Sequence, residues 1–181
     1  PLKVEFGLRN LYTNFADKKT VNIEGNLFTF FEDKIIFNTA YNDSIYIINP
    51  TTLEIEKKVG IASDHSGLSV SSIPINELQE NPDLINPNFR TNGFIRSILY
   101  DKNLGLYSVI ACHKPDGEKL PWSIITLDTN FNKIGETKMD DSKYYLKAWT
   151  TSKGLLISNY YETLNDTDHF EKNTFTLFSY E

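Results

Sequence analysis

The side chains best suited to chemistry fall in three polar segments of the chain. Each segment holds one of the three histidines, His65, His113 and His169, together with acidic residues. Imidazole and carboxylate groups are common metal ligands and common acid–base catalysts. No close spacing such as His-x-x-x-His supports either use here. The sequence therefore predicts no metal site and no catalytic residue, and it leaves these side chains as candidates for ligand binding.

Aromatic residues near the same segments add a second kind of binding chemistry. Apolar sugar faces stack on aromatic rings, while carboxylate and amide groups bind the sugar hydroxyls. Trp122 borders one segment, and Trp149, Tyr160 and Tyr161 are further aromatic candidates, although Trp149 is expected to pack between sheets. The candidate ligand-binding residues are thus His65, His113, His169, Trp122, Asp116, Asp166 and Asp168.

One polar segment faintly resembles a calcium-binding loop. Residues 166–171 read Asp-Thr-Asp-His-Phe-Glu, which supplies several oxygen ligands in a short stretch. The segment lacks the glycine of the sharp turn and the glutamate at position twelve that such a loop uses. We predict no cofactor, with calcium as the alternative.

The composition excludes several classes of function. The 181 residues carry 18 basic and 24 acidic side chains, a net charge of −6, with no basic stripe. Nucleic acids and anionic membrane surfaces are therefore not expected as partners. The lone Cys112 permits no intrachain disulfide, and its apolar neighbours indicate a core residue. No apolar run approaches the length of a membrane-spanning helix.

A strand pattern that occurs three times must position the polar segments. Short apolar runs separated by turn residues, clearest in residues 95–137, are typical of a four-stranded antiparallel meander. Weaker copies occupy residues 27–59 and 145–178. Repetition of this kind predicts an all-β fold, a partial β-propeller of about three four-stranded antiparallel blades. Residues 2–8 and 19–23 are predicted to be N-terminal strands from an incomplete blade.

The topology of a meander sends the long connections to one end of the blades. Connections after the second and fourth strands emerge opposite those after the first and third. The former group holds the long segments 61–93, 113–121 and 162–173. Long loops at one end of a rigid scaffold are the usual place for binding. Residues 1–181 are predicted to form one propeller-like domain, in which 61–93 is an inter-blade insertion with a short helix near residues 75–80.

Three blades are too few to close a ring, because propellers have about four to eight. An open stack exposes apolar blade faces. We therefore expect either the remainder of a larger propeller or a second copy of the chain to pack on these faces. The chain opens within a strand-like segment, residues 1–6, which suggests a truncated N-terminus.

Parts of two repeats resemble a known family. Residues 97–101 (Ser-Ile-Leu-Tyr-Asp), followed by Leu106 and Tyr107, are similar to the blade starts of six-bladed β-propeller-like lipoproteins of unknown function from Bacteroides-type gut bacteria. The resemblance extends from residue 94 to the end. It implies export and lipid anchoring in the periplasm or at the cell surface, and it carries over no catalytic residue. Further matching segments are 123–128, 133–136, 154–158 and 175–178.

The sequence thus favours a non-enzymatic module of an exported bacterial protein that binds a glycan, peptide or protein. A propeller-type carbohydrate hydrolase or lyase using loop His and Asp residues stays open, as does a structural scaffold in a larger assembly. An enzyme predicts that a histidine or a carboxylate pair converges within hydrogen-bonding reach. A binding module predicts a preformed concavity lined by aromatic residues. A scaffold predicts flat apolar faces and neither kind of site.

Overall fold

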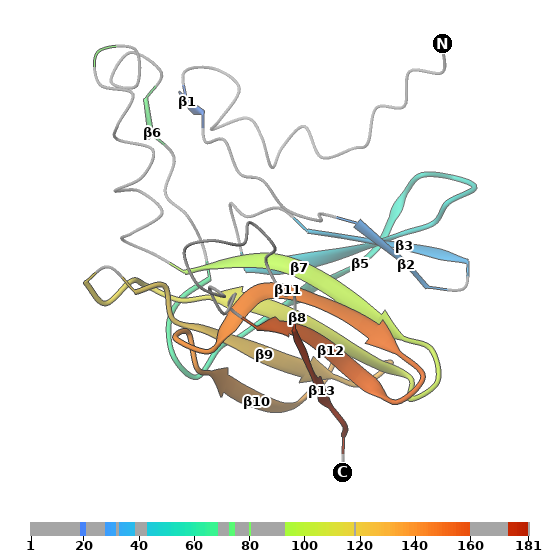
Figure 1. The fold of residues 1–181 in the computed structure, drawn as a ribbon. Coiled ribbons are helices and arrows are strands. Elements are labelled where there is room, and N and C mark those ends of the chain that lie inside the picture. Colours follow the sequence, from blue (N-terminus) through green and yellow to red (C-terminus); the bar gives the residue numbers. More distant parts are fainter. Residues whose placement is uncertain are drawn as a thin grey trace.

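The computed structural model shows an all-β chain whose main body is three stacked antiparallel sheets, not closed into a barrel (Figure 1). The all-β prediction with three repeated meanders is therefore confirmed. No helix in the described part of the chain is long and apolar enough to cross a membrane. The structure describes residues 19–20, 28–31, 33–38, 43–68, 73–74, 80, 93–117, 119–159 and 174–180.

Each main sheet follows the chain order, so every strand pairs with the next one. The first sheet comprises β2 (Phe28–Phe31), β3 (Lys34–Asn38), β4 (Ser44–Ile48) and β5 (Ile55–Gly60). The middle sheet comprises β7 (Phe94–Asp101), β8 (Leu106–Cys112), β9 (Trp122–Leu127) and β10 (Lys133–Met139). The third sheet comprises β11 (Tyr144–Thr151), β12 (Gly154–Asn159) and β13 (Phe175–Phe178).

The middle sheet is covered on both faces, and its sequence shows why. Side chains alternate between the two faces of a strand, so a strand buried on both sides reads as a continuous apolar run. In β8, Val109 and Ala111 pack into a core shared with the first sheet, whereas Ile110 packs into a second core shared with the third sheet. Cys112 is also fully buried, as predicted, and burial raises the pKa of its thiol to about 12.

The first strands of the three sheets lie side by side. β2 contacts β7, and β7 contacts β11. The three sheets are therefore closest to one another at their first strands. The two cores fill the spaces between neighbouring sheets. This arrangement places the ends of all three sheets in two groups, one for the short connections and one for the long connections.

The turns between β4 and β5 and between β9 and β10 are built in the same way. The Oδ1 atoms of Asn49 and Asp128 each accept hydrogen bonds from two backbone N–H groups that follow them. Each turn ends in a residue with positive φ, Leu53 at 60° and Phe131 at 67°. Asparagine and aspartate stabilise such turns by this local bonding. The repeat is therefore visible in the backbone of the turns as well as in the strands.

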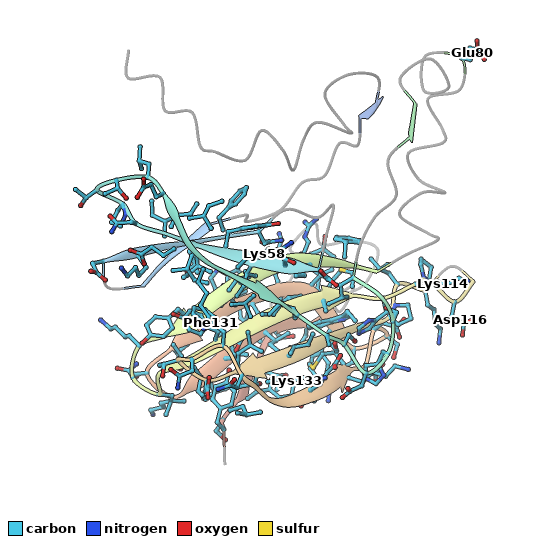
Figure 2. All side chains as sticks on the ribbon, turned by 180° about the vertical axis from the view of Figure 1, so that it is seen from behind. Lys58, Glu80, Lys114, Asp116, Phe131 and Lys133 are labelled. Carbon is cyan, nitrogen blue, oxygen red and sulfur yellow. The ribbon has the colours of Figure 1, made fainter. Side chains whose placement is uncertain are left out.

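The long and short connections of the middle sheet lie at opposite ends, as predicted. Figure 2 shows Phe131, in the turn between β9 and β10, far from Lys114 and Asp116 in the connection between β8 and β9. The segment that follows β5 lies at the same end as Lys114 and Asp116. Its Gly67 carbonyl accepts a hydrogen bond from the Gly93 N–H, next to the start of β7. We call this group of segments the long-connection end.

Only parts of the predicted N-terminal strands and insertion are described. β1 (Lys19–Thr20) pairs with β6 (Ile73–Pro74), apart from the stacked sheets (Figure 1). Glu80 is exposed with helical backbone, while the rest of the helix predicted near residues 75–80 lies outside the described residues. The strand predicted over residues 2–8 also lies outside them.

Gly154 offers a direct test of the tight turn between β11 and β12. Its φ is +132°, and an added Cβ would lie 2.1 Å from the Phe178 carbonyl oxygen. We expect Gly154→Ala to lower the free energy of unfolding by about 3 kcal/mol, through backbone strain and this clash. Urea unfolding followed by tryptophan fluorescence measures the change.

Gly135→Ala is the matched control, because a Cβ at Gly135 meets nothing within 4 Å. We expect this control to change stability by about 0.5 kcal/mol or less. Equal stability of the two variants would contradict the described packing of the third sheet.

Candidate functional site

Two polar features lie one on each side of the middle sheet, and both include residues of the long-connection end, although the first also extends along β10 to Lys133 near the β9–β10 turn. We call the first the polar cluster and the second the pocket. In the polar cluster, Glu136 pairs in register with Ile125, whose side chain belongs to the core facing the first sheet. Alternation along β8 and β9 places His113 and Ser123 on that same side. The polar cluster consists of Ser63, Asp64, His65, Ser66, His113, Ser123, Lys133 and Glu136.

Glu136 is the centre of the polar cluster. Its side chain is only 1% exposed, and each carboxylate oxygen accepts two hydrogen bonds. Oε1 accepts from the hydroxyls of Ser63 at 2.7 Å and Ser123 at 2.6 Å. Oε2 accepts from the Asp64 backbone N–H at 2.8 Å and from Lys133 Nζ at 2.7 Å. A buried carboxylate is tolerated when its charge is met by donors in this way.

The donors keep Glu136 ionised. Burial by itself raises the pKa of this carboxyl, because it disfavours the charged form. The donated hydrogen bonds, that of Lys133 first, outweigh burial and lower the pKa to about 2. Glu136 therefore presents a fixed negative charge to its neighbours at neutral pH.

His113 is buried and bonded through both ring nitrogens. Its Nε2 lies 2.8 Å from Ser123 Oγ, and its Nδ1 lies 3.0 Å from Ser66 Oγ. Because the Ser123 hydroxyl donates its proton to Glu136, the network assigns the ring proton to Nε2 of His113. Nδ1 then accepts from the Ser66 hydroxyl. Burial lowers the pKa of His113, and this effect exceeds the opposing attraction of Glu136, so the ring is neutral at pH 7.

His65 lies beside His113 at the surface of the polar cluster. The two ring centroids are 5.1 Å apart in an edge-to-face arrangement, and His65 Nε2 is 3.9 Å from Glu136 Oε1. The His65 side chain is 35% exposed, whereas His113 is buried. Two of the three histidines predicted to bind a ligand are therefore neighbours, although they are 48 positions apart in the sequence (113 − 65).

Lys133 ties the segment after β5 to the edge strand of the middle sheet. Its ammonium group lies 2.7 Å from Glu136 and 2.9 Å from Asp64, and it donates to the Ala62 carbonyl at 3.3 Å. Lys133 is labelled in Figure 2, in which the molecule is seen from behind. These contacts, with those of Ser63, fix residues 61–68 against β10.

The pocket lies on the other side of the middle sheet, where the starts of β7 and β9 meet the start of β11. Its volume is about 480 Å³, which is within the range of about 300–1,000 Å³ for small-ligand sites. Trp122 is 1% exposed, and its Nε1 has no hydrogen-bond partner in the described part of the chain. The lining residues are Arg96, Lys119, Leu120, Trp122, Asp141, Ser142, Tyr145, Leu146 and Lys147.

The predicted candidates are distributed between these features and the rest of the surface. His65 and His113 meet in the polar cluster, and Trp122 lines the pocket. Asp116 is exposed in the hairpin between β8 and β9, where its backbone pairs with Lys119. His169, Asp166 and Asp168 lie outside the described residues.

Two further expectations concern Trp149 and a bound metal. Trp149, which was expected to pack between sheets, is 46% exposed and stacks edge-on against Phe175 on the outer face of the third sheet. Within the described ranges, no three His, Cys, Asp or Glu side chains are placed to hold a metal ion. The calcium alternative concerned residues 166–171, which are not described, and it stays a prediction.

The sequence interpretation missed the residues that complete the polar cluster. Glu136, Ser123, Lys133 and Ser66 lie in strands or beside a predicted loop residue and show no recognised motif. The signal that could have found them is the alternation of side chains between the two faces of a strand. Ser123 and Glu136 occupy positions in β9 and β10 that face a core, and a polar side chain at a core-facing position needs a partner.

No protein-family model matches the chain, and no curated protein matches it. Its fold is similar to a crystal structure of a member of the DUF4221 family from Bacteroides vulgatus, with a TM-score of 0.61 and 19% sequence identity. The similarity covers 85% of this chain and 46% of that chain, so this chain spans about half of its structural neighbour. Likeness at this level of identity shows a shared fold.

The charge of Glu136 makes stability depend on pH. Its pKa in the folded state, about 2, lies below its ordinary value of 4.5, so its contribution is present above pH 4.5 and is lost as pH falls towards 2. This difference corresponds to a free energy of unfolding on the order of 3 kcal/mol. We expect the stability gap between wild type and Glu136→Gln to shrink by this amount from pH 6 to pH 2 in urea unfolding.

Glu56→Gln is the control for this comparison. Glu56 pairs with Lys34 near the turn between β2 and β3, where the two side chains are 35% and 29% exposed and solvent screens the interaction. We expect the free energy of unfolding of Glu56→Gln to depend on pH almost as that of the wild type does. Parallel profiles for wild type and Glu136→Gln would contradict an ionised, buried Glu136.

Proposed function

We propose that the chain is a ligand-binding module and that its ligand is a carboxylate-bearing oligosaccharide held in the pocket. The observation that carries the proposal is a preformed concavity with a buried tryptophan and clustered cations, located at the long-connection end. Loops and strand ends of a rigid sheet scaffold are suited to hold such groups in place.

The charge of the pocket favours an anionic ligand. Three basic side chains, Arg96, Lys119 and Lys147, line it with one acidic side chain, Asp141, which gives a formal charge of +2 (3 − 1). The chain as a whole carries −6. A local positive charge on an acidic protein attracts carboxylates to that place and repels them elsewhere. Recognition of a carboxylate by lysine and arginine also gives the stronger, charge-assisted hydrogen bonds.

The remaining lining residues favour a sugar as the carrier of the carboxylate. Tyr145 is 41% exposed, and the Lys147 ammonium lies over its ring at 5.4 Å, so an aromatic surface and a cation adjoin. Asp141 and Ser142 provide oxygen atoms that can bind hydroxyl groups. Trp122 supplies an indole N–H that lacks a partner among the described residues. Ring stacking, hydroxyl recognition and a carboxylate contact are together the requirements of an acidic sugar.

The proposal is tested with trigalacturonate as the anionic probe and maltotriose as the neutral probe. We expect calorimetry to detect binding of trigalacturonate, weakening with added salt because the contacts are ionic. Lys147→Ala should weaken this binding about tenfold, equivalent to about 1.4 kcal/mol. Lys102→Ala, in the exposed turn between β7 and β8 at the opposite end of the middle sheet, should have no effect.

Three results would overturn this assignment. Equal binding of both sugars would remove the role of the cations, and unchanged affinity in Lys147→Ala would place the ligand elsewhere. Binding of a peptide with an acidic C-terminus in place of trigalacturonate would replace the sugar by a peptide carboxylate.

The outer face of the third sheet supports a second part of the proposal, a propeller-like assembly. Trp149, Phe175 and Leu177 are each about half exposed there, and strand register places Trp149, Leu156 and Leu177 in one row across the sheet. The corresponding face of the first sheet is buried against the middle sheet, and that of the middle sheet is buried against the third sheet. We propose that this outer face packs on a further sheet, either from the remainder of a larger propeller or from a second copy.

An uncovered face of this kind should make the 181-residue chain associate with itself, because exposed apolar patches drive association. We expect Leu177→Glu to reduce the self-association measured by sedimentation velocity at increasing concentration. Leu104→Glu is the matched control, since Leu104 is 47% exposed but lies in the turn between β7 and β8. A wild-type chain that stays monomeric at every concentration would contradict this role for the face.

A further inference from the structure

The polar cluster contains a serine hydroxyl paired with a neutral histidine. Ser66 Oγ lies 3.0 Å from His113 Nδ1, within the reach that a nucleophile and its general base require. Ser66 is half-buried, and its neighbours His65 and Gly67 are exposed. The hydroxyl is therefore close to solvent, while the base behind it is shielded.

The histidine is oriented by a third and a fourth group. His113 Nε2 donates to Ser123 Oγ at 2.8 Å, and the Ser123 hydroxyl donates to Glu136 Oε1 at 2.6 Å. Every proton in this chain of hydrogen bonds points from Ser66 towards the buried carboxylate. Glu136 thus stabilises positive charge on the imidazole through Ser123, and its own carboxylate is only 3.8 Å from His113 Nε2. A nucleophile that is hydrogen-bonded to a base, which is in turn hydrogen-bonded to an orienting group, is the arrangement used in nucleophilic catalysis.

Anchoring of the loop does not account for the Ser66–His113 contact. Residues 61–68 are already held by the bonds of Ser63 and the Asp64 N–H to Glu136 and by Lys133. Ser66 extends past these contacts to His113. Gly93 leaves the room that Ser66 needs, since a Cβ at Gly93 would lie 2.7 Å from Ser66 Oγ and 2.6 Å from two backbone carbonyl oxygens.

We propose that the polar cluster is a second, catalytic site, separate from the pocket, in which Ser66 attacks small carboxylic esters and water then hydrolyses the acyl-enzyme. This proposal is independent of ligand binding in the pocket, which lies on the opposite side of the middle sheet.

The reaction balances within the residues present and one water molecule. Ser66 Oγ forms a bond to the ester carbonyl carbon while its proton passes to His113 Nδ1. Collapse of the tetrahedral intermediate breaks the carbon–oxygen bond to the leaving alcohol, which takes that proton from Nδ1. Water then attacks the acyl-serine, His113 again accepts the proton and returns it to Ser66, and the carboxylic acid is released. No oxidant, reductant or metal takes part.

The protonation state of His113 fits this role. Burial lowers its pKa from 6.5, so the ring is a free base at neutral pH, and the nearby Glu136 charge compensates the imidazolium formed during attack. The rate should therefore be constant around pH 7 and fall in acid, with a midpoint below 6.5.

The test uses p-nitrophenyl acetate for turnover and a fluorophosphonate probe for covalent labelling of the full 181-residue chain. We expect a burst of one nitrophenolate per chain and a single mass adduct on the peptide that contains Ser66. Ser66→Ala should lose the adduct and at least about 100-fold in rate. Ser66→Cys should regain acylation, because a thiol replaces the hydroxyl as nucleophile.

Ser152→Ala is the matched control, a serine in the exposed β11–β12 turn, and it should keep the burst and the adduct. Circular dichroism and thermal melting establish that each variant is folded. A folded wild-type chain with no adduct on Ser66, or hydrolysis that is unchanged in Ser66→Ala, would overturn the proposal. Trigalacturonate binding should be the same in Ser66→Ala and wild type, so failure of one proposal is distinguishable from failure of the other.

Discussion

The structure depends on the burial of both faces of the middle sheet. A sheet covered on two sides must be apolar at almost every position, and β8 and β9 meet this requirement along most of their length. Each strand then supplies side chains alternately to two cores, Val109 to one and Ile110 to the other. The third sheet differs, because Trp149, Phe175 and Leu177 on its outer face are about half exposed and only its other face contributes to a core.

Polar residues within such a sheet are costly, which makes the position of the polar cluster informative. A carboxylate removed from water loses several kcal/mol of solvation unless donors replace it. Glu136 faces a core yet has four donors, two of them from the segment after β5 and one from Lys133. The buried carboxylate is therefore stable only when residues 61–68 adopt the conformation that brings these donors to it. A loop at the surface is thereby fixed by a charge within the fold.

The sequence predicted the strands well because their signal is local. The alternation and turn residues located all three main sheets to within a few residues. The same topology also predicted the common end for the long connections. It could not identify Glu136 as the partner of His113, because that contact depends on the register between β9 and β10 and on the path of residues 61–68.

Trp149 shows a different reason for failure. Its spacing in β11 is that of a buried residue, but burial depends on whether another sheet covers the face it occupies. Strand register pairs Trp149 with Leu156 and Leu156 with Leu177, so the row is as apolar as a buried one. Local sequence therefore specifies a face suited to burial, and the assembly decides whether that face is covered.

The two polar features meet at a single peptide bond. Trp122 lines the pocket, and the next residue, Ser123, bonds to both His113 and Glu136 on the opposite side of the sheet. A shift of one residue would move the other, since the peptide unit is planar. Yet β9 is paired with β8 and β10 over its whole length, and these ladders oppose any such shift. The strand therefore separates the two features, although each takes a side chain from one of two consecutive residues.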